Sequence, residues 1–109
     1  MAKSKQRVIT NSDNVFADLR LPDAAELNTK ARLGANINAI IAQMDLSQAQ
    51  VAALLGINQP KVSALMHYKL DGFSVERLMH FLVALDHDVE IVVRSKPRTR
   101  SARIEVKAA

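Results

Sequence analysis

The sequence predicts a mainly α-helical fold, a bundle of four to five helices followed by one C-terminal β-strand. Apolar residues recur at helical spacing in several segments between residues 22 and 86. Capping residues and a turn glycine separate these segments, and the spacing changes to an alternating one at residues 88–94. At 109 residues the chain suits one domain with extensions. We therefore expect an N-terminal arm over 1–21, a folded domain over 22–95 and a basic tail over 96–109.

The N-terminal arm is polar and irregular, apart from a few large apolar residues: Val15, Phe16, Leu19 and Leu21. Exposed residues of this kind usually bind a partner or pack back onto the core of their own domain. The sequence leaves both alternatives open for this arm.

The first helix is expected to begin after Pro22, where Asp23 and Glu26 form a plausible capping pair. A helical stripe follows, and we expect it to face the core. Gly34 lies inside this stripe and should weaken the helix by about 1 kcal/mol relative to alanine. It marks either a bend or a close crossing. The stripe consists of Leu33, Ile37, Ile40, Ile41 and Met44.

Residues 46–66 carry the strongest pattern, two short helices joined by a turn at Gly56. Ser47 is a good N-cap, and Gln50 lies three residues later, as a capping box requires. Gly56 follows the last apolar residue, where a left-handed conformation often ends a helix. The residues expected on the buried face of the first helix are Val51, Leu54 and Leu55, and Ile57 is expected to fill the corner.

The second helix of this pair begins with Asn58 as its cap and has Pro60 in its first turn. Its expected inner face is Val62, Leu65 and Met66, and the residues left outward are Gln59, Lys61, Ser63 and His67. Residues 58–69 contain no acid and include Lys61 and Lys69, as expected for a helix that enters a phosphate-lined groove. The pattern predicts a DNA-reading helix-turn-helix. The alternative is two ordinary amphipathic helices around a glycine turn.

A further helix is expected to begin at Ser74 and to end in a turn at 86–88; its apolar face would be Val75, Leu78, Met79, Leu82 and Leu85, with Phe81 beside it. Residues 89–94 then alternate, so that Val89, Ile91 and Val93 share one face. A single strand cannot satisfy its own backbone groups, and the sequence shows no convincing partner strand. We therefore expect residues 88–94 to pair with the same strand of a second copy. The resulting homodimer would suit a palindromic DNA site.

The net charge of +4 is unevenly distributed. Residues 94–109 contain six basic residues against Glu105 alone, whereas residues 1–93 contain nine basic and ten acidic residues. Such a tail either binds nucleic acid without sequence specificity or is a solvated end. The basic residues of the tail are Arg94, Lys96, Arg98, Arg100, Arg103 and Lys107.

Several other functions lack a sequence signature. The chain has no cysteine, and the spacing of His67, His80 and His87 fits no zinc pattern. It shows neither a glycine-rich phosphate loop nor a nucleophile elbow, so we expect no enzyme activity, metal or cofactor. No apolar run is long enough to span a bilayer, and the basic N-terminus lacks the apolar core of a signal peptide. We therefore expect a cytoplasmic protein that does not contact membranes.

The segments 46–52, 55–57 and 60–63 closely resemble the helix-turn-helix of the λ-repressor-like (Xre) family. Segments 14–19, 73–78 and 88–94 resemble the small HigA-type antitoxins, and this likeness covers about residues 12–98. The resemblance implies a λ-repressor-like bundle and a protein that binds double-stranded DNA. It also implies a cognate toxin as partner, for which Val15, Phe16 and Leu19 are candidate contacts.

The resemblance also implies roles for individual residues. Gln48 would contact a phosphate, and the base-reading edge would comprise Gln59, Pro60, Lys61 and Ser63, next to the capping Asn58. Many relatives have an arginine soon after the serine of the second helix, but this chain has Ala64. A backbone contact is then either absent or supplied by His67, Tyr68 or Lys69.

The leading functional interpretation is an operator-binding regulator that represses its own operon and neutralises a toxin encoded beside it. The alternatives are a stand-alone Xre-family repressor without a toxin, and a protein-interaction module that no longer touches DNA. The absence of acidic residues from 58–69 argues against the last of these.

Overall fold

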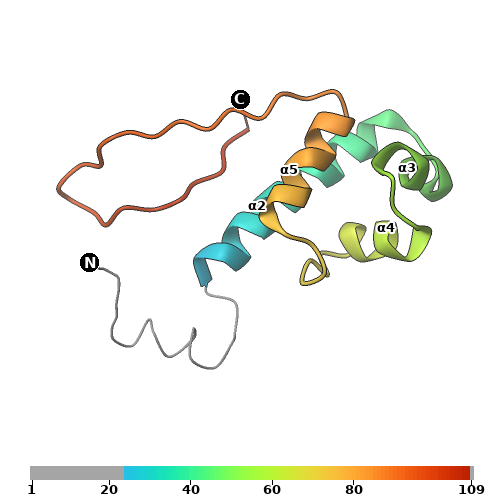
Figure 1. The fold of residues 1–109 in the computed structure, drawn as a ribbon, viewed down its shortest axis with the longest axis horizontal. Helices are drawn as coiled ribbons and strands as arrows, with labels where there is room; N and C mark the ends of the chain where they lie inside the picture. Colours follow the sequence, from blue (N-terminus) through green and yellow to red (C-terminus); the bar gives the residue numbers. More distant parts are fainter. Residues whose placement is uncertain (1–23, 109) are drawn as a thin grey trace.

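The computed structural model describes residues 24–108 and contains four helices in this range (Figure 1). The helices are α2 (Ala24–Met44), α3 (Gln48–Leu55), α4 (Gln59–Met66) and α5 (Val75–Ala84). Helix α2 packs along α5, and α3 packs against α4. The expected mainly α-helical fold is confirmed for this part of the chain. The N-terminal arm and the predicted cap at Asp23 lie outside the described residues.

Each end of α3 is closed by the residues that the sequence indicated. Ser47 Oγ accepts a hydrogen bond from the Gln50 N–H at 3.1 Å, and the Ser47 N–H donates to Gln50 Oε1 at 2.8 Å. At the other end, Gly56 has a φ of 71°, a left-handed conformation that glycine adopts without a steric penalty. The Gly56 and Ile57 N–H groups both donate to the carbonyl of Ala52. This tight closure directs the chain into α4.

The next two helices also begin at their predicted caps. Asn58 Oδ1 accepts the Lys61 N–H at 2.9 Å, and Pro60 occupies the first turn of α4. Ser74 Oγ accepts the Arg77 N–H at 3.0 Å at the start of α5. These bonds satisfy backbone donors that have no partner within a helix, and they fix where each helix starts.

One hydrophobic core joins the four helices. The rings of Phe73 and Phe81 meet edge to face with centroids 5.7 Å apart, an arrangement that aromatic pairs favour. Ile57 lies partly buried against this core, as predicted for the corner between α3 and α4. The largest fully buried side chains are Ile37, Val51, Val62, Leu65 and Leu78.

Three predicted core residues are instead substantially exposed: Met44 at 38%, Leu54 at 40% and Met66 at 38%. Met44 and Met66 are the last residues of α2 and α4, at the ends of their helices. Helix α3 faces the core through Val51, Ala52 and Leu55, so Leu54 falls to one side. The predictions for these three residues were therefore wrong.

Gly34 marks a close crossing, which decides between the two alternatives that the sequence left open. A Cβ atom at this position would lie 3.2 Å from Leu70 Cδ1 and 3.6 Å from the Tyr68 ring. These residues belong to the loop between α4 and α5. The glycine lets this loop approach α2 closely.

The C-terminal segment differs from the prediction. No β-strand occurs among residues 24–108, and residues 88–94 are extended without a hydrogen-bonded strand partner in the described chain. The sequence-based interpretation also missed a second extended stretch. After a turn at 98–100, residues 101–108 run back toward α2 and α5 (Figure 1). Val89 and Val106 pack partly against the core, so both extended stretches are anchored to it.

The core makes a direct prediction about stability. Leu65→Ala should lower the free energy of unfolding by about 2–5 kcal/mol, because Leu65 is fully buried and its truncation leaves a cavity. Leu54→Ala is the matched control and should cost less than about 1 kcal/mol, since that side chain is already partly solvated. Urea unfolding followed by circular dichroism would measure both. Equal losses in the two variants would contradict this description of the core.

Candidate nucleic-acid interface

The orientation of α4 is fixed by its inner face. Val62 and Leu65 are fully buried against the core. The side-chain amide of Asn38, on α2, also donates to the carbonyl oxygen of Leu65 at 3.2 Å. These contacts leave the opposite side of α4 facing solvent.

The first turn of α4 presents three exposed residues in a row: Gln59, Pro60 and Lys61. In helix-turn-helix proteins, the N-terminal residues of the second helix contact base edges in the major groove. Asn58 is exposed too, but its side-chain oxygen is used as the helix cap. Lys61 Nζ lies 5.9 Å from the centroid of the Phe73 ring, which is a weak cation–π contact. A polar and basic edge therefore stands at the position from which a reading helix contacts bases.

Helix α3 extends this surface through Gln48. Gln48 is exposed in the first turn of α3, and its Nε2 donates to Met66 Sδ at 3.8 Å. The contact joins the start of α3 to the end of α4, so Met66 belongs to the outer surface between the two helices. Sequence reasoning missed this role because it assigned Met66 to the core. A DNA phosphate beside Gln48 could also be approached by the free N–H groups of the α3 N-terminus.

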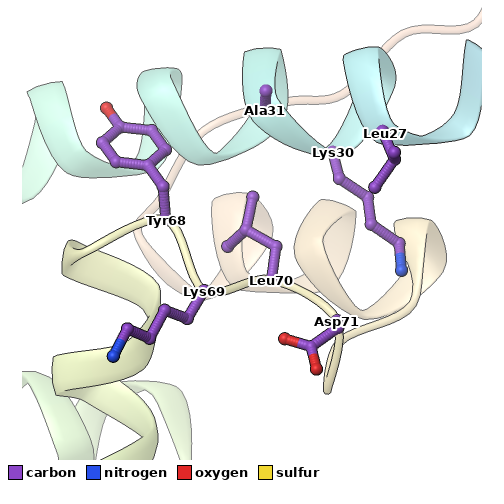
Figure 2. A pocket seen from close by; sticks show the side chains of 7 residues that line it. All are labelled: Leu27, Lys30, Ala31, Tyr68, Lys69, Leu70 and Asp71. Atoms are coloured by element: carbon purple, nitrogen blue, oxygen red, sulfur yellow. The ribbon is translucent and has the colours of Figure 1, made fainter. Parts of the chain in front are cut away.

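The remaining expected contacts separate into two groups. Ser63 is half-buried, and its carbonyl oxygen accepts bonds from the backbone N–H of His67 at 3.0 Å and from His67 Nδ1 at 2.8 Å. His67 and Lys69 are exposed. Tyr68 has a φ of 60° and its ring lies beside α2 at Gly34. Figure 2 shows the Tyr68 ring at α2, with Lys69 extending away from it toward α4. The side chains of Tyr68 and Lys69 therefore point in different directions, and the Tyr68 ring lies against α2.

Two hollows flank the loop between α4 and α5, and neither resembles an active site. One lies between α2 and the loop and is lined in part by Leu27, Ala31 and Leu70, while Lys30 at its edge pairs with Glu26 at 3.5 Å (Figure 2). The other is open, lies next to the first turn of α4, and is lined on its charged side by Lys61, Lys69 and Asp71. Asp71 is thus the first acid that follows the acid-free stretch.

Residues 24–108 contain no group of three or more histidine, cysteine or acidic residues that could hold a metal ion.

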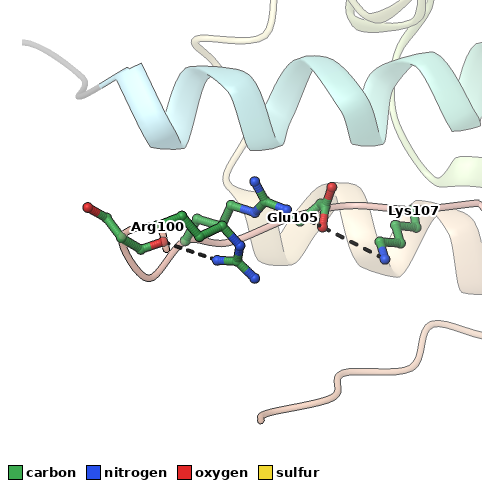
Figure 3. Close-up of polar contacts among 5 residues, drawn as sticks. Arg100, Glu105 and Lys107 are labelled. Carbon is green, nitrogen blue, oxygen red and sulfur yellow. Dashed lines mark hydrogen bonds and ion pairs between the residues drawn. The ribbon is translucent and has the colours of Figure 1, made fainter. Parts of the chain in front are cut away.

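The charges of the tail lie on the extended C-terminal segment. Glu105 contacts Arg103 at 3.4 Å and Lys107 at 3.8 Å, so one carboxylate partly compensates two cations. Figure 3 shows the contact between Glu105 and Lys107. Arg98 and Arg100 lie in the exposed turn, and Arg100 donates to the carbonyl oxygen of Ser101 at 3.1 Å. The two arginines of the turn have no acidic partner within the described chain.

Comparison with known proteins agrees with this geometry. A family model described as a helix-turn-helix domain matches residues 15–94. The chain belongs to this helix-turn-helix family. A solved structure named "Putative XRE Family Transcriptional Regulator" is 66% identical, covers 81% of this chain and 100% of its own, and superposes with a TM-score of 0.77. A search of curated proteins found no match.

The helix-turn-helix predicted from residues 46–66, and its likeness to the Xre family, are confirmed. The resemblance to HigA-type antitoxins is not confirmed by either comparison. Within residues 24–108, no helix is both long and apolar enough to cross a membrane.

The α4 cap gives a prediction that is independent of DNA. Asn58→Ala should destabilise the protein by about 0.5–2 kcal/mol, because the Lys61 N–H loses its acceptor. Asn58→Ser should retain most of the stability, since serine is also a good cap. Thermal unfolding of the two variants is the measurement. If the serine variant were as unstable as the alanine variant, Asn58 would be stabilising α4 by something other than the cap.

Proposed function

We propose that this protein is a sequence-specific DNA-binding transcriptional regulator whose helix α4 reads the major groove. One observation carries the proposal: the buried face of α4 leaves Gln59 and Lys61 exposed at its first turn, within a helix-turn-helix. The name of the similar solved structure supports a regulatory role. The absence of acidic residues from 58–69 disfavours a module that binds only proteins.

Two roles are proposed for these surface residues: some would read bases, and others would position the protein on the DNA backbone. Gln59 can pair with an adenine edge and Lys61 with a guanine edge, and a good pair of this kind is worth about 1–3 kcal/mol of discrimination. Gln48 would hold a phosphate, which fixes the register of the protein on DNA without reading sequence. Ser63, His67 and Lys69 would contact the adjoining backbone, whereas the packing of Tyr68 against α2 disfavours a direct role for that residue.

We also propose that the regulator acts as a homodimer on a palindromic operator. Two helix-turn-helix units related by a two-fold axis would match two half-sites one helical turn apart. The extended residues 88–94 are the candidate interface, through Val89, Ile91 and Val93. Ile91 and Val93 are exposed at 74% and 92%, which is unusual for large β-branched side chains.

The antitoxin role is a separate hypothesis that rests on the sequence resemblance alone. Its candidate toxin contacts, Val15, Phe16 and Leu19, lie outside the described residues. Co-purification with the product of the neighbouring gene would test it directly. A stable complex with a small toxin would support autoregulation within a toxin–antitoxin operon, and the absence of a complex would favour a stand-alone repressor.

We predict that Gln59→Ala and Lys61→Ala each weaken binding to the preferred duplex by about 1–3 kcal/mol, with little effect on random duplexes. Gln48→Ala should weaken binding to both, because phosphate contacts carry no base information. Arg32→Ala is a control that removes an exposed positive charge from α2. Fluorescence anisotropy with the two duplexes would measure all four variants. Unchanged affinity in the Gln59 and Lys61 variants would place the reading surface elsewhere.

We predict that the basic turn adds affinity without specificity. Arg98→Gln combined with Arg100→Gln should make the plot of log K against log salt less steep by up to about 0.9 for each lost phosphate contact. Substitution is preferable to truncation, because truncation would also remove Val106 from the core. The preferred sequence should not change. A slope equal to that of the unmodified protein would show that the turn does not contact DNA.

A further inference from the structure

Two extended arms follow α5, and neither has a backbone partner in the described chain. The first arm comprises residues 88–96 and the second comprises residues 101–107. No backbone N–H or carbonyl of either arm is hydrogen-bonded to the backbone of another described residue. Unpaired extended backbone of this kind is a template for pairing with another chain.

The side chains of the arms alternate as they do in a β-strand. On the second arm, Glu105 contacts Arg103 and Lys107, two residues away on either side, which places these three on one face. On the first arm, exposed apolar residues occur at 91, 92 and 93. Apart from Val89, which packs partly against the core, the first arm is therefore exposed on its faces and has no backbone partner along its edges in the described chain.

The charges of the first arm are complementary to themselves when two copies run antiparallel. If Val92 lies on the two-fold axis, Glu90 stands opposite Arg94 and Asp88 stands opposite Lys96. Each of these pairs occurs twice, because the symmetry repeats it. Ile91 then lies opposite Val93, so that no charge faces an apolar residue. Opposite charges across antiparallel strands stabilise the pair, and like charges destabilise it.

The register shifted to place Ile91 on the axis fits less well. It puts Asp88 opposite Arg94 but leaves Glu90 opposite Val92. Lys96 would then need Asp86 as its partner, and Asp86 has a φ of 67° in the turn that ends α5. A residue in that conformation does not continue an extended strand.

We propose that the first arm is completed by the first arm of a second copy, in the antiparallel register centred on Val92. The inference rests on the homodimer proposed above and specifies which residues hold it together. The occupant is a second copy because the sequence of charges from Asp88 to Lys96 is its own complement under two-fold symmetry. A strand from an unrelated protein would not require this pattern.

A charge exchange tests the register. Glu90→Arg and Arg94→Glu should each raise the dissociation constant of the dimer about 10- to 30-fold, because each creates two like-charge pairs. The combined Glu90→Arg and Arg94→Glu variant should return to within about threefold of the unmodified protein. Sedimentation equilibrium gives the constants. Both residues are exposed, so thermal unfolding of the helices should be unaffected and serves as the folding control.

The outcomes separate this inference from the proposals it builds on. Weakening by both single variants without recovery in the combined variant would overturn the register, and recovery would support it. Single variants that dimerise normally would overturn pairing through the first arm while leaving a homodimer formed elsewhere. A monomeric unmodified protein at micromolar concentration would overturn both the inference and the homodimer. DNA reading by α4 is judged independently by the Gln59 and Lys61 variants.

Discussion

The burial of Val62 and Leu65 on α4 is the constraint on which the rest of the structure depends. These two side chains lock the rotation of an eight-residue helix that has little stability of its own. With positions 62 and 65 buried, the first turn at 59–61 stays exposed, and position 60 lies on the side of the helix opposite the buried pair. Asn38 reinforces the same orientation from α2 through its bond to the Leu65 carbonyl. The polar edge of α4 is thus a consequence of how the core packs.

The sequence predicts the features that depend only on residues close to them in the chain. Ser47, Asn58 and Ser74 each accept a bond from an N–H three residues later, and Gly56 adopts the expected left-handed turn. Features that depend on distant segments could not be predicted in the same way. The exposure of Met44 and Met66 depends on where the neighbouring helices end. The packing of Tyr68 on Gly34 depends on a loop that returns to α2.

The C-terminal arms illustrate the same distinction. The alternation of residues 88–94 predicted an extended segment, but the proposed pairing with a second copy is not visible within a single chain. The second arm escaped sequence reasoning because its many charges suggested either a tail that binds nucleic acid or a solvated end. A period of two was nevertheless present, since Ile104 and Val106 alternate with Arg103, Glu105 and Lys107. Its return to the core through Val106 is visible only in the structure.

The central claim is that α4 reads base sequence, once in each subunit of a dimer. Selection of bound duplexes from a random DNA pool is the most direct test, because it assumes neither the operator nor the partner. We predict enrichment of a palindrome whose half-sites are centred about one helical turn, 10–10.5 base pairs, apart. A pool that binds but shows no enriched sequence would contradict the claim and indicate that the protein holds DNA through its phosphates alone.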